Sequence, residues 1–333
     1  MPSLASKQNR RALFYPRRSV AISGLQFFVG ELFDRTKEPF TGWQHRLLTF
    51  GTKLKAAKCL LALARSDVWY TIGEPKSHKF LEATARILRK PRVMHWVGTD
   101  IQVARENPEL VVSLKKQSVV HLAEVEWTAK ELHTMGLAAH IAPLPPRLMA
   151  SDLPPMPDLF TVLLYIPRTR AYFYGSALCE DLIRSLQKEK LRFLVVGGGS
   201  LNTDAQAPVE NLGFQSSMGT VYPQCSVLLR IPQRDGLSLM VLEALAFGRY
   251  VVWPQLFPFV DTVSDYASIE ITIRELHARH LAGALPLQIA ASRFVSERYT
   301  QERCLLDIAD AWEGSVVAMK QARRRRNGAV RLD

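Results

Sequence analysis

The sequence is poor in residues that bind metal ions or cross-link chains. It has four cysteines in 333 residues, scattered without a C-x-x-C pair and each within an apolar stretch. Such cysteines are typical of reduced thiols in a protein core and of a reducing compartment. No D-x-D is present, and no His, Cys and Asp residues recur at metal-ligand spacing. We therefore expect no metal cofactor.

Long apolar runs and a leader are missing as well. No run approaches the roughly 18 apolar residues that a membrane-spanning helix needs. Residues 1–18 contain five Lys and Arg residues but no apolar core, so we expect no signal peptide. Together these features predict a cytoplasmic protein, with a peripheral location at the inner face of the membrane as a variant of that prediction.

Acidic residues are fewer than basic ones. The chain has 43 Lys and Arg against 31 Asp and Glu, a formal net charge of +12. Much of the excess lies at the two ends, including Lys320, the run at 323–326 and Arg331. These termini suit an anionic membrane surface, a nucleic acid or a polyphosphate, and a solvated, frayed tail is an equal alternative. Because no zinc-finger spacing and no RNP-like aromatic segment accompanies the charge, we expect no nucleic-acid partner.

Apolar strand and helix patterns alternate along most of the chain, which is long enough for two domains. This alternation predicts an α/β fold with doubly wound parallel sheets. The predicted strands are 11–16, 67–72, 92–96, 119–122, 139–141, 160–166, 191–196, 227–229 and 250–252. The predicted helices are 21–33, 54–64, 79–88, 125–135, 177–187, 237–247, 271–281, 287–299 and 301–319, and residues 38–42 are expected to form a loop.

A proline-rich segment separates two such patterns. Six prolines fall between residues 143 and 157, where they stiffen the chain and exclude regular structure. We place the domain boundary here. The expected organisation is an N-terminal domain (1–148), a C-terminal domain (149–300), a helix at 301–320, and a basic tail (321–333).

The stretch 228–254 carries the clearest chemical pattern. A short buried strand is followed by a loop with Asp235 and Gly236 and then by an amphipathic helix that ends at Gly248. Glu243 lies eight residues after Asp235, about 12 Å further along a helix. Between them, the amides of Gly236, Leu237 and Ser238 form an anion site at a helix N-terminus.

Two carboxylates flanking an anion site suit a ligand with hydroxyls at both ends and phosphate in the middle. A nucleotide sugar has this arrangement. Taken alone, the pattern is explained equally well by a capping Asp and a solvated helical Glu.

The same stretch resembles a glycosyltransferase signature. Its sequence D-G-L-S-x-x-V-L-E-A-L-A-x-G-R-x-V-V at 235–252 is similar to the form E-G-F-G-x-x-x-x-E-A-x-A-x-G-x-P-V-V of retaining GT-B glycosyltransferases of the family 4 type. It differs by Asp at the first acidic position, Leu-Ser after the glycine, and Arg249-Tyr250 where Pro is common. The H-W-V-G-T-D segment at 95–100 resembles that of a bacterial subgroup.

The resemblance implies a GT-B architecture, two Rossmann-like doubly wound parallel-sheet domains facing a cleft. It implies an acceptor-side domain at 1–148, a nucleotide-sugar domain at 149–300 and a last helix at 301–320 that crosses back to the first domain. It also implies a short strand at 211–214 and a helix at 217–222. It places Glu243 on the ribose hydroxyls of the donor and Asp235 on the hydroxyls of the transferred sugar. Gly236, Leu237 and Ser238 then hold the diphosphate. Arg168 matches the arginine after the first strand of the donor domain. The family's lysine is replaced by Tyr174, so either Arg170, Arg230 or Arg234 supplies its charge or phosphate binding is weakened.

In the first half of the chain, His95 resembles the histidine that such enzymes place beside the donor sugar. A packed histidine at a strand end is the alternative. Asp100 is interpreted either as a general base or as a helix cap. Thr99 and Gly24 are expected on the acceptor side, and Glu124 and Glu126 are weaker candidates near the cleft.

The sequence thus predicts a glycosyltransferase that moves a sugar from a UDP- or GDP-linked donor to a saccharide or lipid-linked acceptor, with retention of configuration and without a metal ion. Two alternatives remain. One is a catalytically decayed GT-B-like nucleotide-binding or scaffold protein, suggested by Tyr174 and Asp235. The other is a nucleotide-sugar epimerase.

Overall fold

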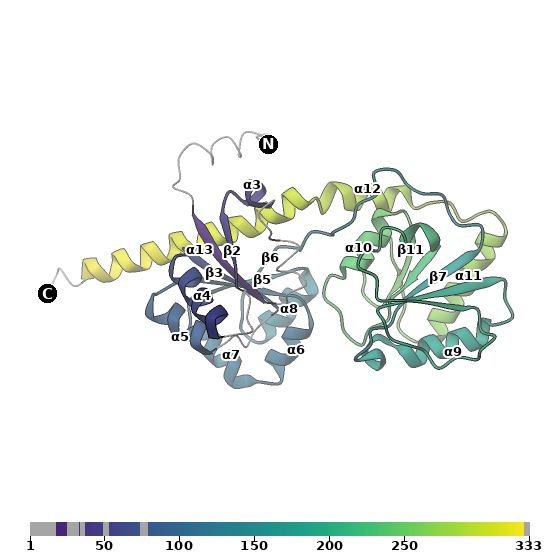
Figure 1. Ribbon diagram of the computed structural model, residues 1–333, viewed down its shortest axis with the longest axis horizontal. Helices are drawn as coiled ribbons and strands as arrows, with labels where there is room; N and C mark the ends of the chain where they lie inside the picture. The colour runs from purple at the N-terminus through teal and green to yellow at the C-terminus, as the bar shows by residue number, and fades with distance from the viewer. Residues whose placement is uncertain (1–17, 25–32, 34–36, 49–52, 74–78, 330–333) are drawn as a thin grey trace. The chain divides into compact units, whose positions relative to one another are not determined.

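The structure is a computed structural model that describes residues 18–24, 33, 37–48, 53–73 and 79–329. It divides into two compact units (Figure 1). The first contains Met1–Pro145 and Gln301–Asp333, and the second contains Pro146–Thr300. The division therefore falls three residues before the boundary expected from the prolines, and the last helix lies in the first unit.

A parallel sheet forms the centre of the first unit, with the strand order β2-β1-β3-β4-β5-β6. Its central strands β3 and β4 are buried along their whole length, as expected where helices cover both faces. The strands are β1 (Ser19–Gly24), β2 (Gln44–Leu47), β3 (Val68–Ile72), β4 (Arg92–Trp96), β5 (Val119–Ala123) and β6 (Ala139–Ile141).

Helices lie on both faces of this sheet (Figure 1). Adjacent residues of β3 show the two faces, because side chains alternate along a strand. Trp69 packs in a cluster with Leu63 and Leu81, whereas the ring of Tyr70 lies 5.2 Å from that of Trp312. The helices are α3 (Glu38–Thr41), α4 (Lys53–Ala64), α5 (Lys79–Ile87), α6 (Thr99–Arg105), α7 (Pro108–Lys115), α8 (Glu126–Thr134) and α13 (Gln301–Ala329).

The second unit is built around another parallel sheet, with the strand order β12-β11-β10-β7-β8-β9. Its strands are β7 (Phe160–Tyr165), β8 (Leu191–Val196), β9 (Val209–Gly213), β10 (Val227–Leu229), β11 (Tyr250–Trp253) and β12 (Asp261–Thr262). Its helices are α9 (Ser176–Leu186), α10 (Leu239–Ala246), α11 (Tyr266–Leu281) and α12 (Ile289–Arg298), with short 3-10 turns at Ala171–Tyr174 and Tyr222–Gln224. One large cluster of buried side chains from β7, β8, α9 and α11 forms part of its core.

The predicted fold class is confirmed: both sheets are all-parallel and six-stranded, with helices between the strands. Several local predictions are wrong. Residues 21–24 of the predicted helix 21–33 belong to β1, because the run from Val20 to Ile22 pairs with strands on both sides. Residues 38–41 form α3 rather than a loop, with Pro39 in the first turn and Gly42 in the left-handed region at its end.

Further differences concern the segment around Gly219, four short elements and the end of the last helix. The helix predicted at 217–222 is replaced by turns, since Gly219 interrupts it and only the 3-10 turn beginning at Tyr222 forms. Strands β2 and β12 and helices α6 and α7 were not predicted. The strand predicted at 11–16 lies outside the described residues. The last helix continues to Ala329, so most of the expected basic tail is helical.

Candidate functional site

In the second unit, the candidate site lies where the strand order reverses. β7 is followed by β8 and β9 on one side, and the chain then returns to β10 on the other side of β7. In open parallel sheets, ligands bind at the carboxyl ends of the strands at such a switch point. Arg230 follows β10 directly, and Arg168 follows β7 by three residues. The sheet topology therefore marks the same edge that the sequence pattern marks.

Asp235 is held by a guanidinium and an indole. Arg230 donates to both of its oxygens, with Nε to Oδ2 at 2.6 Å and the second nitrogen to Oδ1 at 3.1 Å. The indole N–H of Trp253, at the end of β11, donates to Oδ2 at 3.2 Å. Such a bidentate contact fixes the carboxylate in one orientation. The Asp235 side chain is 14% exposed.

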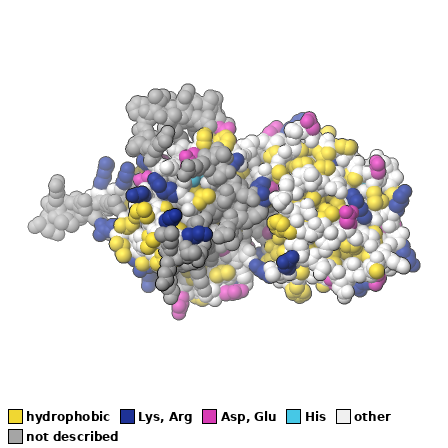
Figure 2. Space-filling view, viewed as in Figure 1, with side chains coloured by type: hydrophobic (Ala, Val, Ile, Leu, Met, Phe, Trp, Pro, Cys, Tyr) yellow, Lys and Arg dark blue, Asp and Glu magenta, His cyan; other side chains and the backbone are white. Residues whose placement is uncertain are grey.

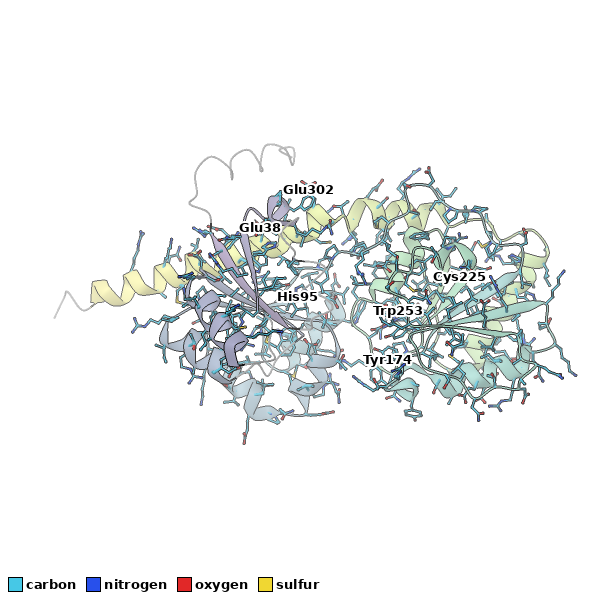
Figure 3. All side chains as sticks on the ribbon, in the orientation of Figure 1. Glu38, His95, Tyr174, Cys225, Trp253 and Glu302 are labelled. Carbon is cyan, nitrogen blue, oxygen red and sulfur yellow. The ribbon has the colours of Figure 1, made fainter. Side chains whose placement is uncertain are left out.

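Aromatic rings enclose the Arg230 guanidinium. Its central carbon lies 5.5 Å from the centroid of Tyr165 and 5.4 Å from that of Tyr174. Figure 3 shows Tyr174 and Trp253 in this part of the second unit. Tyr174, which the sequence resemblance aligned with the family's lysine, thus contacts the Arg230 guanidinium. The neighbouring Asp235 carboxylate raises the pKa of Arg230 against the opposing effect of burial, so this cation stays charged.

The amino end of α10 follows this cluster. Gly236, Leu237 and Ser238 are buried, and Ser238 is the N-cap residue. The Ser238 hydroxyl makes no cap bond to the helix and has no hydrogen-bond partner among the described residues. The residue is nevertheless buried, with only 6% of its surface exposed. Buried hydroxyls normally have a partner. This orphan hydroxyl, next to helix amides, is therefore suited to an incoming anion.

Glu243 lies further along α10 and is 4% exposed. It accepts hydrogen bonds from the hydroxyl of Tyr222 at 2.8 Å and from the backbone N–H of Arg147 at 3.1 Å. Burial raises the pKa of Glu243, and the two donors partly counter this effect. The carboxylate is thus already bonded to the protein, and its contact with a ribose stays a prediction.

Three further arginines predicted at this site lie in its loops. Arg168 and Arg170 are exposed, and Arg170 stands over the ring of Phe173 at 4.6 Å. Arg170 has φ of +66°, an uncommon backbone conformation for a residue with a side chain. Arg234 is half-buried beside Asp235 in the chain. These side chains add positive charge around the pair of Arg230 and Asp235.

His95 has a different environment in the first unit. It is fully buried at the end of β4, where Nδ1 shares a 2.6 Å hydrogen bond with the Tyr70 hydroxyl. Burial lowers the pKa of His95 to about 3, an effect that the nearby Ala142 backbone only partly counters. The imidazole is therefore neutral. This geometry favours the packed histidine over a group that contacts a sugar.

The contacts of Asp100 likewise favour the helix cap over the general base. Its carboxylate accepts from the Val97 amide at 3.1 Å and from the Ile101 amide at 3.0 Å, which orders the turn leading into α6. Burial raises the pKa of Asp100 to about 6, although these amides oppose the rise. The adjacent Thr99 is exposed.

Gly24, predicted on the acceptor side, ends β1 at the switch point of the first sheet. A Cβ there would lie 2.2 Å from the carbonyl oxygen of Ile72, and its φ is +134°. The glycine is thus required by a close approach of two backbones. Glu124 is buried, whereas Glu126 is exposed and lies 4.0 Å from Lys130.

Four contacting residues were missed by sequence reasoning: Arg147, Tyr165, Tyr222 and Trp253. Only Tyr222 had a signal, since the family pattern places a tyrosine in that segment. Within the described residues, no group of three or more His, Cys, Asp and Glu side chains is arranged to hold a metal ion. The helices described are also too short or too polar to cross a membrane.

Comparison with known proteins gives the fold. No family profile matches the chain, and no curated protein sequence is similar to it. Among solved structures, Anabaena HepE in complex with UDP and glucose has a TM-score of 0.64 at 13% identity, covering 90% of this chain and 100% of that one. Sucrose-phosphate synthase from Thermosynechococcus elongatus has a TM-score of 0.61 at 13% identity, covering 94% and 100%.

The pneumococcal O-GlcNAc transferase GtfA, in complex with UDP and GlcNAc, has a TM-score of 0.58 at 11% identity. That match covers 81% of this chain, and the chain spans 61% of the transferase. At these identities the likeness concerns the fold. The chain therefore has the GT-B fold of glycosyltransferases, which confirms the expected architecture.

Proposed function

We propose that this protein transfers a sugar from a nucleotide-sugar donor to a saccharide or lipid-linked acceptor, with the donor bound at the switch point of the second unit. The observation that carries the proposal is the orphan Ser238 hydroxyl at the start of α10. A helix N-terminus alone is common, but a buried hydroxyl without a partner beside it calls for an external ligand. A diphosphate supplies the acceptor oxygen that Ser238 lacks.

The surrounding groups fit the remaining parts of such a donor. Arg168, Arg170 and Arg234 supply positive charge for the leaving diphosphate. Asp235, oriented by Arg230 and 14% exposed, meets the hydroxyls of the transferred sugar. Glu243 meets the ribose if its oxygens accept a further hydrogen bond beside Tyr222 and Arg147. UDP is the proposed carrier, because two of the similar structures contain it.

The transfer itself is a substitution at the anomeric carbon. The bond from that carbon to the donor phosphate oxygen breaks, and its electron pair leaves with the diphosphate. The acceptor hydroxyl oxygen bonds to the same carbon and loses its proton. Retention of configuration and independence from metal ions belong to the proposal on the family resemblance alone.

A binding experiment on Ser238→Ala tests the donor site. Because Ser238 makes no cap bond, we expect the variant to melt at nearly the wild-type temperature, whereas UDP should bind about 10-fold more weakly after loss of one charge-assisted hydrogen bond. Calorimetric titration with UDP and GDP gives both the affinity and the base. Ser185→Ala on α9 is the matched control, since its hydroxyl bonds to the Leu182 carbonyl. Wild-type UDP affinity in Ser238→Ala would contradict the proposal.

A second candidate function is a nucleotide-binding protein without turnover. It is favoured by a specific observation, namely that protein groups already occupy both carboxylates of the motif. Incubation of the wild type with UDP-sugars and a panel of acceptors separates the two candidates. Tight UDP binding without release of UDP from any sugar supports the second, and a product that stays on the nucleotide supports an epimerase.

A further inference from the structure

A pocket of about 340 Å³ opens in the first unit, far along the strands from His95. Its lining includes Trp69, Arg92 and Val119, which stand at or next to the amino ends of β3, β4 and β5. In a parallel sheet these ends share one edge, opposite the carboxyl ends. Arg92 and His95 are three residues apart, about 10 Å along a strand. The pocket is therefore separate from the predicted acceptor-side residues and lies in the other unit from the proposed donor site.

Basic side chains dominate this pocket. Five of them line it, with a single carboxylate, Glu82, among them. The five are Arg86, Arg89, Lys90, Arg92 and Lys116. They come from the end of α5, the loop after it, β4 and the end of α7, four segments that the fold brings together. In Figure 2, dark blue Lys and Arg side chains are frequent on the first unit.

Arg92 provides a fixed cation at the floor of the pocket. It is 4% exposed, and its guanidinium carbon lies 4.5 Å from the centre of the Trp69 ring, which is its neighbour across β3 and β4. One of its nitrogens lies 3.5 Å from Glu82. Burying a guanidinium is costly unless it is held in this way. Its positive charge, together with burial, lowers the pKa of His121 to about 4.

The loop between α5 and β4 is also fixed. Arg89 has φ of +48°, a backbone conformation that residues other than glycine seldom adopt. Next to it, the Lys90 ammonium donates to the backbone carbonyl oxygens of Ala64 at 2.8 Å and of Ser66. The backbone conformation of this loop and the hydrogen bonds of Lys90 to backbone carbonyls therefore fix the loop at the pocket, so the position of its positive charges does not depend on mobile side chains alone.

We propose that this pocket binds a phosphate group that carries an organic substituent. Planar guanidinium groups suit phosphate oxygens, which they bind in pairs. The walls formed by Trp69, Ala85, Met319 and Ala322 are apolar and accommodate the substituent. The volume lies at the lower end of the range for ligand sites, roughly 300–1,000 Å³. The ligand is either a free phosphate ester or diphosphate, or the phosphate headgroup of an anionic lipid.

Two double variants test this pocket in the whole protein. Arg89→Gln with Lys116→Gln removes two cations from its rim, and both side chains are exposed, so the fold should be retained. Arg105→Gln with Lys130→Gln is the control, because it removes the same charge from α6 and α8 of the same unit. Inorganic pyrophosphate is the soluble probe, measured by calorimetry with sulfate as a competitor. Vesicles of phosphatidylcholine with or without phosphatidic acid are the membrane probe, measured by sedimentation.

We expect the pocket variant to bind at least one probe 10-fold or more weakly, whereas the control variant stays within about 2-fold of the wild type. Loss of pyrophosphate binding alone identifies a soluble phosphate, and loss of vesicle binding that pyrophosphate also displaces identifies a lipid headgroup. Equal weakening in both variants means a diffuse effect of net charge and overturns the proposal. So does a wild type that binds neither probe, or binding that sulfate displaces as well as pyrophosphate does.

Discussion

Both sheets are parallel and six-stranded, but their strand orders differ, and so does the burial of their polar groups. At the switch point of the second sheet, Arg168 and Arg170 are exposed, Asp235 is 14% exposed, and the Ser238 hydroxyl has no partner among the described residues. In the first unit, His95 is fully buried in an aromatic cluster, where its Nδ1 bonds to Tyr70 and its Nε2 has no hydrogen-bond partner among the described residues. The difference teaches that topology marks an edge for ligands, but the exposure of the polar groups there shows whether a ligand can reach that edge.

Trp312 of α13 is the centre of that aromatic cluster. Its ring lies between 5.2 and 6.0 Å from those of Phe33, Trp43, His45 and Tyr70. The last helix therefore covers the face of the first sheet on which Tyr70 lies. The predictions below either break the contrast between the two units or sharpen it.

The largest effect is expected from Trp312→Ala. Removal of a fully buried indole leaves a cavity among four rings, at a cost of about 3–5 kcal/mol in the free energy of unfolding of the first unit. Urea denaturation measures the loss. Val317→Ala on the same helix is the control, since Val317 is partly exposed and its loss should cost about 0.5 kcal/mol. UDP affinity unchanged in Trp312→Ala would support a donor site confined to the second unit.

Arg230→Gln should destabilise the second unit by about 2–3 kcal/mol, because it leaves the Asp235 carboxylate without its bidentate partner. The estimate is at the lower end for a buried pair, since Asp235 is partly exposed. Arg184→Gln breaks an exposed pair on α9 and should cost at most about 0.5 kcal/mol. Equal losses in the two variants would show that Arg230 is no anchor for Asp235.

Acid should act on the first unit through His95. Its pKa falls from 6.5 to about 3 on folding, so the folded state binds fewer protons between these values. The contribution of His95 to the free energy of unfolding is then fully present above about pH 6.5. It declines as the pH falls towards 3, by up to about 1.4 kcal/mol per pH unit. Denaturation of wild type and His95→Gln across this range should show a shallower decline in the variant.

Asp100 should change the unfolding free energy of the first unit with pH in the opposite direction. Its pKa rises from 3.8 to about 6 on folding, so its contribution is fully present below pH 3.8 and is lost as the pH rises through 6. The difference in unfolding free energy between wild type and Asp100→Asn should therefore shrink as the pH rises. Parallel curves for the two proteins would mean that Asp100 is not a buried carboxyl in solution.

The smallest effect is a stabilisation. Gly314 lies on an exposed face of α13, and a Cβ there would meet no atom within 4 Å. Gly314→Ala should stabilise the first unit by up to about 1 kcal/mol through helix propensity. Gly24→Ala is the counterpart and should destabilise it, because the Cβ would clash with Ile72. Thermal unfolding distinguishes the two, and a stable Gly24→Ala would contradict the close approach.

The sequence predicted what local pattern controls. Buried strands such as β10 and β11 were found because continuous apolar runs bounded by turns have few other interpretations. β1 was missed since the apolar residues that follow it, up to Phe33, gave the segment a helical period. The short edge strand β2 has only one buried residue, so no pattern marked it.

The candidate site was predicted in its position but not in its contacts. Asp235, Ser238 and Glu243 were placed by a motif within one segment. Their partners come from elsewhere in the chain, as with Arg147, which lies 96 residues before Glu243. Likewise, nothing in the H-W-V-G-T-D segment indicated that Tyr70 would bond to His95. Such pairings depend on tertiary packing, which spacing along one element does not encode.

The return of α13 to the first unit has a consequence for the order of events during synthesis. Residues Pro146–Thr300 form a continuous unit that is synthesised between the two parts of the first unit. At roughly 5–20 residues per second, that stretch alone takes on the order of ten seconds. Throughout that time the first unit lacks the indole that its aromatic cluster surrounds. The half of the chain that is translated first is the half that is completed last.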